Sequence, residues 1–174
     1  MRYFQAFPKT VYNNQLVTNI SLRVIIDKLA KLDKSLYHPY TIKDGDRPDI
    51  VAVNYYGDSY YLWLIFLVND ITDPYYDWPL DEVTFKNYII KKYGSLVAAQ
   101  QKIEGYKSLY TDTPIFLTPD SYNVLPLDEF ANWSSYSAYD MEVERNESKR
   151  YIKLVDKSYA IRFDNELKAL LKNG

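Results

Sequence analysis

The sequence predicts an α+β fold organised around a central βααβ unit. A short strand signal, Tyr40–Lys43, is followed by a tight turn in which Gly45 can take a positive φ. Two stretches of helical length come next, and Gly57 between them is suited to end the first in a left-handed conformation. The extended segment Trp78–Leu80 follows the second helix, and we expect it to pair beside Tyr40–Lys43 as the closing strand.

An N-terminal arm and a helix are predicted ahead of this unit. Aromatic residues occur in residues 1–17 without a period, which favours an extended arm. Residues 19–35 carry apolar side chains three or four positions apart, the spacing of one helix face: Leu22, Ile25, Leu29 and Leu32. We therefore assign residues 1–38 to an arm and an amphipathic helix.

The two helices of the central unit have recognisable starting points. The first covers residues 47–56, and we expect the carboxylate of Asp46 to cap it. The second covers residues 59–69 and begins after a cap at Asp58 or Ser59. This second helix is apolar on all sides, so we expect it to be buried.

A third helix completes the central region, which spans residues 39–94. Asp81 is expected to cap this helix and Gly94 to end it. Residues 95–138 then predict a short helix over 95–103, followed by an irregular wrapping segment that contains three prolines and little periodicity.

A hairpin and a final helix are predicted for residues 139–174. The segments 139–145 and 150–155 flank the polar turn Asn146–Lys149, a pattern typical of a β-hairpin. Apolar residues at helical spacing over 159–172, with lysines near the end, predict an amphipathic C-terminal helix.

The composition excludes several classes of function. The chain has no cysteine and one histidine, His38, which excludes disulfide frameworks, thiolate zinc sites and multi-histidine metal centres. Its 21 basic and 23 acidic residues give a net charge of −2, without the basic surplus that nucleic-acid binding requires. The most apolar run, Leu62–Val68, is far shorter than the roughly twenty residues that span a bilayer. Residues 1–14 contain no apolar run, so we expect no signal peptide and a soluble protein made in the cytosol.

No motif in the sequence indicates catalysis. There is no glycine-rich phosphate loop among the five glycines, and no pair of carboxylates stands out as a catalytic pair. The acidic cluster Asp44, Asp46 and Asp49 lacks the ligand spacing of a calcium-binding EF-hand loop. We therefore predict that the protein is not an enzyme and has no metal or other cofactor.

Tyrosine is unusually abundant, with 19 residues, and aromatic residues make up 17% of the chain. Tyrosine combines an apolar face with a polar tip, so it is enriched in protein interfaces and sugar-stacking sites. The turn at residues 73–79 concentrates aromatic residues beside two prolines, and the N-terminal arm carries more. The candidate interface residues are Tyr75, Tyr76 and Trp78 in the turn and Tyr3 and Phe4 in the arm. For Trp78, coverage of the protein's own core is an equal alternative.

The order of these signals over residues 40–80 resembles a LysM module. Members of that family have an aromatic and β-branched strand, a Gly-Asp turn, a helix ending at an aromatic-Gly pair, and a second helix ending in Asn. These features match Tyr40, Gly45-Asp46, Ile50, Tyr56-Gly57, Leu64 and Asn69. The resemblance assigns structural roles to Gly45, Asp46, Pro48, Gly57, Trp63 and Asn69.

Over most of its length the chain also resembles the gene product 53 family of baseplate wedge proteins from contractile-tailed phages. The residues that carry this resemblance are Arg47-Pro48, Tyr56-Gly57, Trp63, Asn69-Asp70, Asp73-Pro74-Tyr75-Tyr76 and Trp78. It implies a structural subunit of the virion tail baseplate, assembled in the host cytoplasm and present in six copies. Its implied partners are the wedge-core subunit, the sheath-initiating subunit and the hub. Its implied role is to join neighbouring wedges into a ring around that hub, without contact to nucleic acid or membrane.

The alternative function is that of a glycan-binding LysM module that recognises peptidoglycan or chitin. In such modules the sugar lies between two segments that correspond here to Gly45–Asp49 and Asn69–Asp73. This chain departs from the glycan binders because Arg47-Pro48 follows the turn where a small hydroxyl residue is common. A tail lysozyme would need a catalytic domain, for which 174 residues leave little room.

Overall fold

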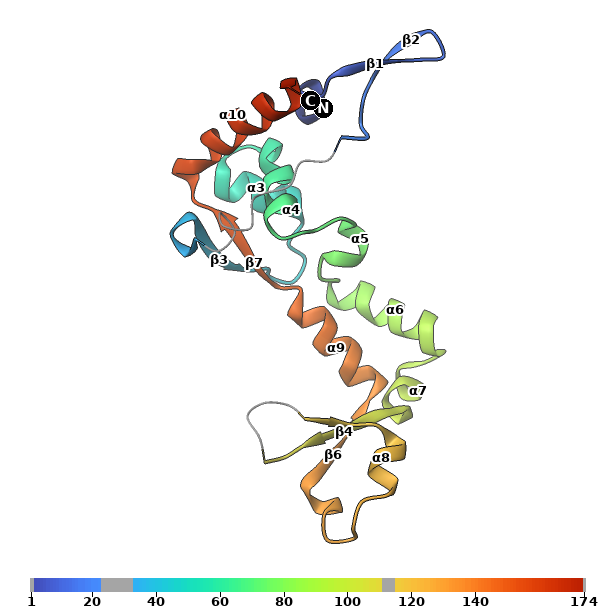
Figure 1. The fold of residues 1–174 in the computed structure, drawn as a ribbon. Helices are drawn as coiled ribbons and strands as arrows, with labels where there is room; N and C mark the ends of the chain where they lie inside the picture. The colour runs from blue at the N-terminus through green and yellow to red at the C-terminus, as the bar shows by residue number, and fades with distance from the viewer. Residues whose placement is uncertain (1, 23–32, 111–114, 174) are drawn as a thin grey trace. The chain divides into compact units, whose positions relative to one another are not determined.

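The computed structural model describes residues 2–22, 33–110 and 115–173, which form two compact units. The first unit combines residues 1–78 with residues 150–174, and the second is the continuous segment 79–149 between them (Figure 1). Both units contain helices and strands, so the α+β prediction is confirmed.

The first unit holds residues 39–78 of the predicted central region, whereas the third helix of that region lies in the second unit. The helices and strands of the first unit are α1 (Arg2–Gln5), β1 (Lys9–Tyr12), β2 (Gln15–Thr18), η1 (Lys34–Leu36), β3 (Tyr37–Thr41), α3 (Pro48–Tyr56), η2 (Ser59–Tyr61), α4 (Leu62–Val68), α5 (Pro74–Asp77), β7 (Tyr151–Val155) and α10 (Lys157–Asn173). The helices predicted over 47–56, 59–69 and 159–172 are therefore present. The helix predicted over 19–35 rests mainly on residues 23–32, which lie outside the described residues.

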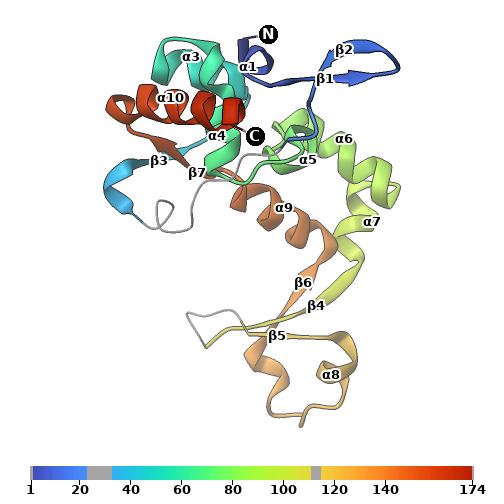
Figure 2. The same cartoon turned by 45° about the horizontal axis from the view of Figure 1, so that its top comes forward.

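The core of the first unit forms where α4 packs against the antiparallel pair β3–β7 (Figures 1 and 2). Leu64 and Ile65 of α4 and Val155 of β7 have almost no solvent-exposed surface, as expected for a helix that is apolar on every side. The closing strand is therefore β7, and the prediction that residues 78–80 would pair with the first strand is wrong. Strand periodicity does not specify a partner, and here the partner lies beyond the whole second unit.

The turn before α3 shows why one predicted cap is wrong. Pro48 is the first residue of α3, so Arg47 occupies the cap position and Asp46 lies one residue too early to cap the helix. The Asp46 carboxylate instead accepts hydrogen bonds from the Lys43 amide at 2.9 Å and the Tyr40 hydroxyl at 3.0 Å. It thus closes the turn that contains Gly45, whose φ of +77° confirms the predicted left-handed conformation.

Asn69 connects α4 to the sheet. Its side-chain amide donates to the carbonyls of Ile65 and Lys153, and its side-chain oxygen accepts from the Lys153 amide, each at 2.8 Å. The side chain therefore satisfies the end of the helix and also pairs with the backbone of β7. The Asn69 side chain therefore links α4 to β7 in addition to bonding at the helix end.

The N-terminal segment is not a simple extended arm. Residues 2–5 form α1, and β1 and β2 form an antiparallel hairpin whose turn holds Asn13 and Asn14 at positive φ. Asparagine tolerates this conformation better than most residues, and two consecutive positive φ values are typical of a tight hairpin turn. The spacing of the aromatic residues gave no sign of β1 and β2 or of the tight turn that joins them.

The second unit contains helices around a small sheet. Its elements are α6 (Glu82–Tyr93), α7 (Leu96–Gln101), β4 (Ile103–Ser108), β5 (Phe116–Leu117), α8 (Pro119–Asn123), η3 (Phe130–Asn132), β6 (Trp133–Ser137) and α9 (Ala138–Ser148). The described strands form one antiparallel sheet in the order β5–β4–β6. The helix caps predicted at Asp81 and Gly94 are confirmed, since Asp81 accepts from two amides and Gly94 has a φ of +88°.

The hairpin predicted over residues 139–155 is wrong. Residues 138–148 form α9, and only residues 151–155 form a strand, which pairs with β3. The alternating pattern was compatible with a helix as well, because Ala138, Glu142 and Asn146 recur every four residues and are all buried. A capping box, in which Ser137 and Asp140 exchange side-chain and backbone hydrogen bonds, starts this helix and gave a local signal for it.

Candidate protein-interaction site

The turn around α5 is held rigid by its own side chains. Asp73 caps α5 and accepts a hydrogen bond from the Tyr75 amide at 2.9 Å. The carboxylate of Asp77 accepts from the amides of Thr72, at 2.9 Å, and Asp73, at 3.0 Å. Pro74 fixes the backbone at the first helical position. Two carboxylates and one proline therefore hold the backbone of this turn in shape.

The two tyrosines of this turn are directed to solvent. Tyr75 is 86% exposed and Tyr76 is 72% exposed, values that are high for large aromatic side chains. The structure separates Trp78 from this pair: it is only 7% exposed, packs in the core, and donates from its indole nitrogen to the Asp46 carbonyl at 2.8 Å. Trp78 was considered either as an interface residue or as a cover for the protein's own core, and its position is that of a core residue.

The predicted arm residues Tyr3 and Phe4 lie in α1, and Tyr3 contacts the Trp63 ring. The rings of Tyr3 and Trp63 stack with centroids 5.9 Å apart, and the partial burial of Tyr3 raises the pKa of its hydroxyl. Phe4 is more exposed and, together with Tyr3, Leu62, Trp63 and Phe66, lines an apolar groove of about 550 Å³. Tyr3 is thus partly a packing residue, whereas Phe4 contributes to an accessible apolar surface.

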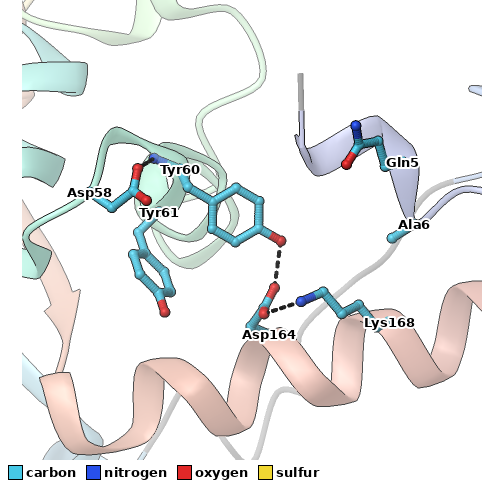
Figure 3. Close-up of a pocket in the computed structure, with 7 residues that line it drawn as sticks. All are labelled: Gln5, Ala6, Asp58, Tyr60, Tyr61, Asp164 and Lys168. Carbon is cyan, nitrogen blue, oxygen red and sulfur yellow. Dashed lines mark hydrogen bonds and ion pairs between the residues drawn. The ribbon is translucent and has the colours of Figure 1, made fainter.

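A second pocket, of about 500 Å³, adjoins α1, η2 and α10 (Figure 3). The Tyr60 hydroxyl donates to one oxygen of Asp164, and the Lys168 ammonium donates to the other, both at 2.5 Å. Burial, with the Asp164 carboxylate as a further cause, raises the pKa of the Tyr60 hydroxyl. The bond from Tyr60 to Asp164 connects η2 to α10. Sequence reasoning missed this contact because 104 positions separate Tyr60 from Asp164 and neither residue has a local motif.

Comparison with known proteins identifies the family. The family described as base plate wedge protein 53 matches residues 8–108, more than half of the chain. The chain is also 29% identical over 145 residues to the baseplate wedge protein gp53 of Enterobacteria phage T4. That alignment covers 78% of this chain and 74% of the T4 protein. The chain belongs to the base plate wedge protein 53 family. It is a structural protein of the virion, located in the phage tail baseplate.

This baseplate wedge protein has a buried ionic network in its second unit. The side chain of Glu142 is 3% exposed and accepts from Lys92 at 2.7 Å and from the Tyr93 hydroxyl at 3.0 Å. Burial opposes ionisation of Glu142, but these donors outweigh it and lower the pKa of the carboxyl, while the same hydrogen bond raises the pKa of Lys92. Such a paired carboxylate links α6 to α9 and is not available as a general base.

In this baseplate wedge protein, two polar groups of the segments where a LysM module would hold sugar make internal hydrogen bonds. The Asp46 carbonyl accepts from the Trp78 indole, and the Asn69 amide bonds to the backbone of α4 and β7. Across the described residues no group of three or more potential metal ligands occurs. Among the same residues, no helix has the length and apolar character needed to cross a bilayer.

Proposed function

We propose that this protein joins neighbouring wedges of the baseplate into a ring around the hub, and that Tyr75 and Tyr76 anchor that contact. The observation that carries the proposal is the exposure of two adjacent tyrosines on a turn that Asp73 and Asp77 hold rigid. Tyrosines with few rotatable bonds on a fixed backbone lose little conformational entropy on docking, so much of their burial contributes to affinity.

The partners of this contact would be other baseplate components. The family resemblance supports the wedge-core subunit, the sheath-initiating subunit and the hub as partners, with six copies of the protein in each particle. The net charge of −2 supports the same role, since it keeps mutual repulsion small when copies crowd into a ring. The function requires no catalysis and no cofactor, because binding energy alone can hold the subunits together.

The experiment combines purified wedges with the protein and follows ring formation by analytical ultracentrifugation. The double variant Tyr75→Ala/Tyr76→Ala should remain folded but fail to convert wedges into six-fold rings. Tyr151→Ala is the matched control: Tyr151 lies on β7 of the same unit and is 76% exposed, and its loss should leave ring formation unchanged.

Two outcomes would contradict the proposal at different levels. Full rings from the folded double variant would remove Tyr75 and Tyr76 as the anchor. Wild-type protein that neither binds wedges nor promotes rings would remove the joining function itself. A separate pull-down on peptidoglycan and chitin should show no retention, and retention that soluble chito-oligomers compete away would favour glycan binding instead.

A further inference from the structure

The N-terminal hairpin is an exposed two-stranded ribbon with an anchored base. Phe7, just before β1, is buried in the core of the first unit, and the Asn19 amide donates to the Pro8 carbonyl at 2.8 Å to close the base. Beyond this point no other strand of the described residues pairs with β1 or β2. Both views show the hairpin projecting past α1 (Figures 1 and 2).

The hairpin exposes apolar side chains to water, which is unfavourable in free energy. Val11 and Leu16 are directly opposed, so they lie on the same face, and they are 68% and 66% exposed. An isolated two-stranded hairpin is only marginally stable in water, because it has no third strand or helix to cover such a face. The apolar pair therefore indicates that the hairpin acquires a partner.

The register shows which backbone groups are available to that partner. In an antiparallel pair, hydrogen-bonded and non-hydrogen-bonded positions alternate, and the bond from Asn19 to Pro8 fixes the phase. Lys9 and Val11 consequently occupy non-hydrogen-bonded positions. Their amide and carbonyl groups point outward along the edge of β1, while those of Thr10 and Tyr12 point toward β2.

The edge of β1 is the more open of the two. All four residues of β1 are exposed, whereas the second half of β2, Val17 and Thr18, is partly buried. Lys9 is also the only charged residue in residues 9–18. A second copy of the hairpin would add another lysine and no carboxylate, whereas a different partner can supply an acidic residue.

We propose that the outer edge of β1 receives an extended strand from another baseplate subunit, which adds to the hairpin as a third strand. The partner strand carries an apolar residue beside Val11 and an acidic residue near Lys9. Main-chain hydrogen bonds to Lys9 and Val11 supply affinity, and the two side chains supply register. The inference rests on the proposed role in baseplate assembly but is independent of Tyr75 and Tyr76.

Two substitutions of Val11 distinguish the contribution of its backbone amide to binding from that of its side chain. Val11→Pro removes the outward amide, which has no partner within the hairpin, so the hairpin itself should persist. Val11→Thr keeps that amide and a side chain of nearly the same shape. With wedges purified without this protein as the probe, we expect Val11→Pro to weaken binding at least tenfold and Val11→Thr to change it less than threefold.

Hydrogen exchange provides a readout that does not depend on ring formation. On addition of wedges, amide exchange in residues 9–11 of the wild-type protein should slow at least tenfold, and it should slow equally in Tyr75→Ala/Tyr76→Ala. Unchanged exchange in the wild-type hairpin would overturn the strand-addition proposal even if rings form. Equal losses for Val11→Pro and Val11→Thr, wild-type binding by Val11→Pro, or a change in self-association caused by Val11→Pro would also overturn it.

Discussion

Two pairs of adjacent tyrosines, twenty positions apart in the first unit, have opposite surroundings. Tyr55 and Tyr56 end α3 and pack against the core, and the Tyr56 hydroxyl donates to the Val155 carbonyl of β7 at 3.0 Å. Burial raises the pKa of Tyr56 above its ordinary value. Tyr75 and Tyr76 lie in α5 and extend into solvent.

The difference arises from the backbone around each pair. Gly57 takes a φ of +87° and Asp58 caps the next helical turn, so the chain reverses and brings the Tyr55 and Tyr56 rings onto the core. At α5 the carboxylates of Asp73 and Asp77 fix the turn, and both tyrosine side chains are largely exposed. Identical dipeptides can therefore be packed in one place and exposed in another.

Loss of the packed pair should have the largest effect. Tyr55→Ala/Tyr56→Ala removes two rings and the hydrogen bond to Val155, and we expect it to lower the free energy of unfolding by about 3 kcal/mol or more. Urea denaturation followed by circular dichroism measures this change. Tyr55→Phe/Tyr56→Phe keeps the rings and should cost only about 1 kcal/mol. Equal losses for both double variants would mean that packing does not hold this pair.

Gly57→Val should have the next largest effect because it changes the backbone that turns the packed pair inward. Apart from the two adjoining residues, nothing lies within 4 Å of the position a Cβ would take, so the cost arises from φ rather than from a clash with the surroundings. A β-branched residue in this conformation should destabilise the unit by well over about 1 kcal/mol. Gly57→Asn should lose less, since asparagine tolerates positive φ. An unchanged melting midpoint for Gly57→Val would contradict the assigned helix end.

Contacts between neighbouring residues were predictable from the sequence. The positive φ of Gly45, the left-handed Gly57, the helix end at Gly94 and the cap at Asp81 were predicted because each depends on residues a few positions away. The tyrosine-rich turn was identifiable by the same reasoning, since Asp73 and Pro74 start it. Local chemistry thus located the candidate site and the ends of most helices.

Contacts between the two parts of the first unit, which residues 79–149 separate in the sequence, were not predictable in this way. β3 pairs with β7, with His38 opposite Leu154, and nothing in either strand's alternation specifies a partner so distant. β7 pairs with β3 in the place that was expected for residues 78–80. Trp78 is therefore not part of that sheet, and its ring packs in the core instead. The hairpin prediction over residues 139–155 was wrong for a different reason: the alternation there fits a helix as well as a strand, and the capping box at Ser137 is the local signal that favours the helix.

Acid should affect the packed region through Asp156, which lies between β7 and α10 close to Tyr55. Hydrogen bonds from Ser158 and His38 lower the pKa of Asp156 to about 2. The unfolded chain takes up this proton near pH 4, so the native state loses relative stability as pH falls from about 4 to about 2. Asp156→Asn should remove this contribution. The urea midpoint should therefore fall less between pH 5 and pH 2.5 in the variant than in the wild type, and equal falls would contradict the pairing.

Loss of the exposed pair should have the smallest effect on stability. Tyr75→Ala/Tyr76→Ala leaves the hydrogen bonds of Asp73 and Asp77 in place and removes rings that bury little area, so the free energy of unfolding should change by less than about 0.5 kcal/mol. Urea denaturation beside Tyr55→Ala/Tyr56→Ala provides the direct comparison. A loss comparable to that of the packed pair would show that the rings support the turn. In that event a failure of the variant to form rings could no longer be assigned to a lost interface.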